Sequence, residues 1–140
     1  MIGNAMAHMN YLSLVIAALA YFFLGAVWYS KALFATQWMA LNNINMDNPE
    51  ARKGVIGMML TTFVLTLIIC ICMWVLVYGI GLYGVMHGIK LGLLCSVGFS
   101  ATTISMSYIY LRKPTMLYVI DCGYHVVGMI IAGSVLCGMH

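Results

Sequence analysis

The residues of this sequence best suited to chemistry are an acid and an imidazole one helical turn apart, Asp121 and His125, with Tyr124 beside them. They interrupt an apolar run long enough to cross a membrane, and ionisable groups inside such runs are candidates for function. Helix positions three and four apart share a face, so the three side chains point the same way. The pattern favours proton or cation handling. The structural alternative is that Arg112, Lys113 or hydroxyls of neighbouring helices hold the acid, which then only locks the helices together.

Lys90 is the other charge inside an apolar run. In a hairpin that turns at Arg112 and Lys113, Asp121 lies opposite Ile104. Lys90 lies about 14 residues further along, which at about 1.5 Å per residue separates it from Asp121 by roughly 20 Å. Helix geometry therefore argues against an ion pair between them. We expect the Lys90 ammonium group to extend to the headgroups on the outer side.

The sequence lacks the patterns typical of metal centres and catalytic sites. No two of its histidines, His8, His87, His125 and His140, have the spacing of three or four residues that places two ligands side by side. Nucleophile elbows, phosphate-binding loops and metalloprotease motifs are absent as well. The net charge of +3 is too small, and too confined to loops, for nucleic-acid binding. We therefore expect no metal, no cofactor, no nucleic-acid partner and no enzymatic activity.

The elements that must position these residues are long apolar runs. Of the 140 residues, 64% are hydrophobic and 6% are charged, which excludes an ordinary soluble domain. A membrane-spanning helix needs about 20 apolar residues, and these runs are continuous where barrel strands would alternate. We predict a single all-α membrane domain over residues 1–140, with four transmembrane helices in an antiparallel bundle. The predicted helices cover residues 11–30, 50–78, 85–110 and 116–138.

The connection between the first two helices, residues 31–53, is the only extended polar segment. Apolar residues on one face predict a short interfacial helix here, and Trp38 is the kind of side chain that lies at headgroup level. The basic residues gather in this connection and in the third one, as Lys31, Arg52, Lys53, Arg112 and Lys113. By the positive-inside rule, both basic connections are cytoplasmic and both termini lie outside.

Small residues recur every four positions along the third helix, at Gly84, Gly88, Gly92, Ser96 and Ser100. Such a stripe allows another helix backbone to approach closely. The pattern leaves open whether that helix belongs to the same chain or to a second copy. A pore lined by the hydroxyl groups of the third helix is a further alternative.

Two segments carry a family resemblance. One is Gly25-Ala26-Val27-Trp28-Tyr29-Ser30, followed by Leu33-Phe34 and Trp38-Met39; the other runs from Gly88-Ile89-Lys90-Leu91-Gly92-Leu93, through Gly98-Phe99 and Arg112-Lys113-Pro114, to Ile120-Asp121-Cys122-Gly123-Tyr124. Together they resemble a family of small bacterial membrane proteins catalogued as domain of unknown function 1761. The resemblance implies four helices and residence in the membrane, and it implies no reaction, substrate or cofactor.

Topology brings the distinctive residues of both segments to one boundary of the membrane. The first helix runs inward, the third helix finishes on the inner side, and the fourth starts there. We predict a polar cluster centred on Asp121 at this boundary. Its predicted members are Trp28, Tyr29, Ser30, Ser105, Ser107, Asp121, Tyr124 and His125. The cluster requires Asp121 to lie within about 8 Å of Tyr29, since side chains cannot hydrogen-bond over a larger gap.

Two classes of function fit these features. In the first, the chain is a bacterial inner-membrane protein that moves a small ion or solute, with Asp121 as the acid. Four helices are too few to enclose a pathway with alternating access, so this class requires a homo-oligomer. In the second, the chain is an accessory or scaffold subunit of a larger membrane complex. The lipid bilayer is a partner in both.

Overall fold

The structure, a computed structural model, describes residues 1–45 and 49–140. In these ranges every regular element is a helix, which confirms the predicted all-α class. Four helices are long and apolar enough to cross a membrane: α2 (Tyr11–Trp28), α5 (Val55–Ile80), a third made of α6 (Val85–Cys95), the π-helical segment η1 (Ser96–Ala101) and α7 (Thr102–Tyr110), and α8 (Thr115–Gly138). The short helices α1 (Ile2–Ala7), α3 (Ala35–Leu41) and α4 (Pro49–Arg52) complete the fold.

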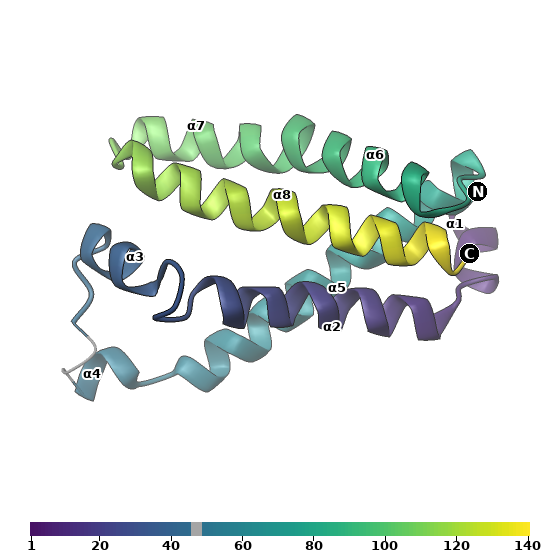
Figure 1. The fold of residues 1–140 in the computed structure, drawn as a ribbon. Coiled ribbons are helices and arrows are strands. Elements are labelled where there is room, and N and C mark those ends of the chain that lie inside the picture. Colours follow the sequence, from purple (N-terminus) through teal and green to yellow (C-terminus); the bar gives the residue numbers. More distant parts are fainter. Residues whose placement is uncertain (46–48) are drawn as a thin grey trace.

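The two ends of the molecule differ in what they hold (Figure 1). Both chain termini lie at one end, together with the turn between α5 and α6. The other end carries α3, α4 and the turn between α7 and α8. The residues predicted to form the polar cluster belong to this second end, because they lie near the end of α2 and the start of α8.

Two observed helix boundaries differ from the approximate predicted ones. The helix predicted over residues 50–78 is divided into α4 and α5, because Gly54 has a φ of 77°, a left-handed conformation that cannot continue a helix. The first helix ends at Trp28, before the predicted residue 30. There the chain folds back on itself, and the Phe34 amide donates to the Trp28 carbonyl at 3.1 Å.

The stripe of small residues packs α6 against α8 within the chain. Gly88, Gly92 and Ser96 are all buried. A Cβ atom on Gly88 would overlap the Gly133 carbonyl, and one on Gly92 would overlap the Met129 carbonyl, so the two helix backbones are in direct contact. This finding answers the question that the sequence left open, since the partner of these glycines is a helix of the same chain. The other two members of the predicted stripe are not buried: Gly84 is exposed and Ser100 is half-buried.

The third helix diverges from α8 beyond this contact. The π-helical segment η1 changes the hydrogen-bonding register of the helix, which rotates the faces of all later residues. The Thr103 hydroxyl donates to the Phe99 carbonyl at 2.7 Å within this region. Every residue of α7 is exposed or half-buried, whereas α6 buries four residues. The hairpin is therefore tightly closed near the termini and open near α3.

The remaining core lies where α2, α5 and α8 cross. The Tyr21 ring of α2 is 1% exposed and fills the space that a side chain on Gly128 of α8 would need. Trp74 of α5 is equally buried and donates to the Ala5 carbonyl of α1 at 2.8 Å. All five cysteines are free thiols, and four of them are buried as small apolar residues would be. Large apolar side chains cover much of the outer surface, as expected for a chain solvated by lipid.

Candidate functional site around Asp121

The Asp121 carboxylate accepts three hydrogen bonds from uncharged donors. Its Oδ1 accepts from the Tyr29 hydroxyl at 2.7 Å and from the Trp38 indole N–H at 3.0 Å, and its Oδ2 accepts from the Tyr108 hydroxyl at 2.5 Å. The ion pair that the structure describes joins Lys53 and Glu50 at an exposed position. None of the described Lys, Arg or His side chains forms an ion pair with Asp121, which lies within the helical domain.

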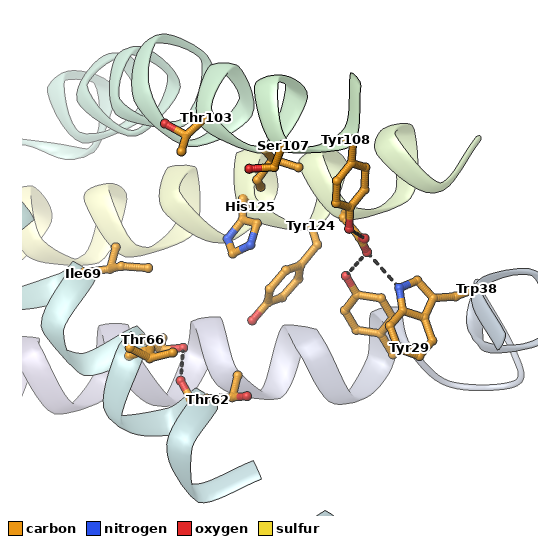
Figure 2. A pocket seen from close by; sticks show the side chains of 13 residues that line it. Tyr29, Trp38, Thr62, Thr66, Ile69, Thr103, Ser107, Tyr108, Tyr124 and His125 are labelled. Atoms are coloured by element: carbon orange, nitrogen blue, oxygen red, sulfur yellow. Dashed lines mark hydrogen bonds between the residues drawn. The ribbon is translucent and has the colours of Figure 1, made fainter. Parts of the chain in front are cut away.

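Three separate elements bring these donors to Asp121. Tyr29 directly follows α2, Trp38 lies on α3, and Tyr108 lies on α7, whereas Asp121 lies in the second turn of α8. The rings of Tyr29 and Trp38 meet edge to face with centroids 5.6 Å apart. Figure 2 shows both side chains directed toward the same point beneath Tyr108.

Tyr29 keeps its proton in this arrangement. Burial of the phenol, together with its hydrogen bond to Asp121, raises the pKa of Tyr29 above its ordinary value of about 10. The Tyr29 hydroxyl is thus a hydrogen-bond donor at all physiological pH values, which is the role that a neighbouring carboxylate requires.

His125 and Tyr124 extend the polar site along α8. The Nδ1 atom of His125 lies 2.7 Å from the Tyr21 hydroxyl, so Tyr21 orients the imidazole. The Tyr124 ring packs edge to face against Tyr29, with centroids 5.5 Å apart, and it points from α8 toward Thr66 on α5 (Figure 2).

Asp121 and His125 line one cavity of about 560 Å³ between α5, α7 and α8. Its wall contains Tyr29, Trp38, Thr62, Leu65, Thr66, Ile69, Thr103, Ile104, Ser107, Tyr108, Asp121, Tyr124 and His125. A second cavity of about 410 Å³ lies between α2 and α5. Tyr29, Thr62 and Tyr124 line both cavities, so these three side chains form the partition between them.

The structure brings most of the predicted cluster together and separates some of its members. Tyr29, Tyr124, His125 and Ser107 share the cavity with Asp121. Trp28 stands behind it, where its indole N–H donates to the Ile120 carbonyl at 3.0 Å.

Two predicted serines face elsewhere. Ser105 lines a separate cavity beside Arg112 and Lys113, and its hydroxyl donates to the Ala101 carbonyl. Ser30 lies in the turn after α2 and is not among the residues lining the cavity of Asp121. Lys90 is exposed on α6, at the end of the molecule near the termini.

Sequence reasoning missed two of the three donors to Asp121. Tyr108 could have been found, because helical side chains tilt toward the helix N-terminus. A tyrosine at 108 therefore reaches back to the level of Ile104, which is the level of Asp121 in the hairpin. Trp38 was predicted at headgroup level without a specific partner, and the structure adds the partner: its side chain is half-buried and its N–H donates to Asp121. Only the fold of residues 31–41 shows this contact.

Comparison with known proteins identifies the family of the chain. The family described as "Protein of unknown function (DUF1761)" matches residues 12–137, a range that includes Asp121 and all three of its donors. No curated protein and no solved structure matches the chain. The match confirms the resemblance seen in the sequence, and the chain therefore belongs to the DUF1761 family, whose function is not established.

Proposed function

We propose that this chain binds a small ion or solute in the cavity beside Asp121 and carries it through the membrane. The observation that supports this proposal is an acid in the wall of a cavity, between helices long enough to span a bilayer, that forms no ion pair with the cationic side chains the structure describes. Such an acid is costly to keep in a membrane domain and attracts positive charge to its surroundings. The activity needs no cofactor and no covalent chemistry, so the chain is not an enzyme under this proposal.

The transport role requires more than one copy of the chain. The cavity lies between α5 and α7, and a pathway with access from both sides needs more walls than four helices supply. We propose a homo-oligomer in which a second copy covers this opening. Helix α8 already packs against the glycines of α6, so the contact between copies uses other surfaces of the chain.

A second candidate function, a scaffold or accessory subunit, is favoured by the partners of Asp121. Three donors from three different elements tie the end of α2, α3 and α7 to α8 through a single carboxylate. A half-buried carboxylate with hydrogen bonds to both oxygens favours one arrangement of the helices that supply its donors. In this role the acid holds the shape of a surface that a larger membrane complex recognises.

We also propose a location and an orientation. The bacterial plasma membrane fits the family resemblance, and the basic connections fit a cytoplasmic position by the positive-inside rule. Both connections lie at the end of the molecule that also holds Asp121 (Figure 1). Single cysteines placed at Lys31 and at the exposed Gly3, in a chain with its own cysteines replaced, test this. The proposal expects labelling in intact cells at residue 3 alone, and labelling at residue 31 alone would overturn it.

The substitution Asp121→Asn separates the two functions, because asparagine keeps the shape of the side chain and removes its charge. Glu50→Gln is the matched control, since Glu50 is exposed on α4. Purified variants are placed in proteoliposomes, and proton and cation fluxes are recorded with dyes inside the vesicles. Transport predicts flux in the wild type and in Glu50→Gln that disappears in Asp121→Asn. Equal absence of flux in all three, with a lower melting temperature for Asp121→Asn alone, would instead favour the scaffold.

A further inference from the structure

We infer that the cavity beside Asp121 takes a lipophilic organic cation with one positive charge, such as a quaternary ammonium or phosphonium ion. This inference names the substrate class for the proposed transport function and rests on that function. It is carried by three features of the cavity: a carboxylate that no described cationic side chain pairs with, the lack of a second carboxylate among its described lining residues, and its aromatic wall.

The charge of the site follows from its one acidic side chain and the partners of that side chain. Tyr29, Trp38 and Tyr108 are uncharged groups that donate to Asp121. No Lys, Arg or His side chain that the structure describes forms an ion pair with it, so its carboxylate leaves one negative charge unbalanced at the cavity wall. A ligand that balances this charge carries a single positive charge.

The site is poorly suited to an inorganic cation. Cations such as Na⁺, Ca²⁺ and Mg²⁺ require several oxygen ligands in direct contact. Asp121 is the one acid among the described residues that line the cavity, and its two oxygens together already accept three hydrogen bonds. The other lining side chains with oxygen atoms, such as Thr66 and Thr103, offer only uncharged hydroxyl groups. In the described part of the chain, no three His, Cys, Asp or Glu residues lie where they could hold a metal ion together.

Aromatic rings supply what an organic cation needs in place of oxygen ligands. Tyr29, Trp38, Tyr108 and Tyr124 all line the cavity, and a ring face attracts a cation that lies within about 6 Å of its centre. Figure 2 shows these rings gathered near one end of the cavity. They stand on the side where Asp121 is held, because three of them contribute its donors.

The rest of the cavity suits a lipophilic ligand. Leu65 and Ile69 of α5 and Ile104 of α7 form apolar parts of its wall. Its volume of about 560 Å³ falls within the range of roughly 300–1,000 Å³ that is usual for sites of drug-sized molecules. The wall is built from membrane-spanning helices, so a ligand dissolved in the bilayer can enter from the side.

Two probes of equal shape and opposite charge test the inference without altering the protein. Tetraphenylphosphonium and tetraphenylborate are nearly the same size, and only their charge differs. Specific binding of each labelled ion is measured by equilibrium dialysis on the full chain in lipid nanodiscs, after subtraction of the binding to empty nanodiscs. We expect the phosphonium to bind at least tenfold more tightly than the borate. Equal affinities, or tighter binding of the borate, would overturn the inference.

Variants then locate the binding. Asp121→Asn should weaken phosphonium binding at least tenfold, which corresponds to about 1.4 kcal/mol. Glu50→Gln should leave it unchanged. Circular dichroism and gel filtration show whether Asp121→Asn folds, and the pair of probes on the wild type decides the matter if it does not. Phosphonium binding that is equal in a folded Asp121→Asn variant and the wild type would contradict the inference.

The same set of measurements separates this inference from the proposed function. If neither probe binds but a proton or metal-ion flux depends on Asp121, the substrate class is wrong and the transport function stands. If neither probe binds and no flux is found, both fail. If the phosphonium binds at Asp121 and crosses the membrane faster in wild-type proteoliposomes than in protein-free liposomes or in proteoliposomes with Asp121→Asn, both are supported.

Discussion

The close contact between α6 and α8 predicts a large penalty for adding one methyl group to Gly92. A Cβ at this position would lie 2.3 Å from the Met129 carbonyl oxygen, whereas ordinary contacts begin at 3.4 Å. The two helices must therefore separate by roughly 1.1 Å, the difference between these distances. A gap of about 0.5–1 Å forfeits about a quarter to a half of the dispersion energy of each contact, and overpacking typically costs about 1–3 kcal/mol. We expect Gly92→Ala to lose stability by this amount.

Thermal unfolding in detergent, followed by circular dichroism, measures the effect. We expect a decrease in melting temperature of about 2–8 °C, since 1 kcal/mol shifts the melting of a small domain by a few degrees. Gly57→Ala is the matched control, because it makes the same chemical change in α5 with nothing within 4 Å of the added carbon. It should melt at the temperature of the wild type or slightly above it.

Two results would refute this reasoning in different ways. Equal melting temperatures for Gly92→Ala and Gly57→Ala would mean that α6 and α8 do not approach so closely. If Gly92→Ala instead dissociated an oligomer and left the melting of the monomer unchanged, the glycine stripe would act between copies of the chain. Cross-linking in membranes, before and after the substitution, distinguishes the second result from the first.

Further predictions concern the donors to Asp121. Tyr108→Phe removes one hydrogen bond to the carboxylate and should cost about 1–3 kcal/mol in thermal unfolding, whereas Tyr110→Phe, at a position 88% exposed on the same helix, should cost nothing measurable. The raised pKa of Tyr29 predicts that the chain loses stability at alkaline pH, because above about pH 10 the phenol keeps its proton in the folded chain and ionises in the unfolded chain. The contribution of Tyr29 to stability is therefore complete below about pH 10 and is lost as the pH rises further. Between about pH 9 and 11.5, the melting temperature of the wild type should fall more steeply than that of Tyr29→Phe; parallel curves would contradict this.

Several features of the site could be derived from residue order alone. The turn at Arg112-Lys113-Pro114 sets the level of each residue in the hairpin, and the direction of the first helix brings Tyr29 to the level of Asp121. Their hydrogen bond of 2.7 Å lies well inside the distance that the predicted cluster required. The same reasoning, extended by the tilt of helical side chains, would have placed Tyr108 at Asp121 as well.

Other features depended on contacts that no local pattern encodes. Trp38 lies in a short polar connection whose composition suits a membrane surface, and its contact with Asp121 arises only because the chain folds back after Trp28. The π-helical segment is another example, because residues 85–110 read as one continuous apolar helix. Without it, Ser100 would continue the buried stripe of Gly88 and Gly92.

The sequence by itself determined that the outer surface suits lipid, that four helices are long enough to span a membrane, and at which end of the molecule Asp121 lies. These properties follow from composition, run length and connection length, which are local and additive along the chain. The tertiary structure alone decided that the glycines of α6 are occupied by α8, and that α7 and α5 leave a cavity beside Asp121. The physical reason is that packing depends on which side chains meet across helices. A single residue such as Gly92 or Tyr21 sets the distance between two packed helices through its contacts with residues far away in the sequence.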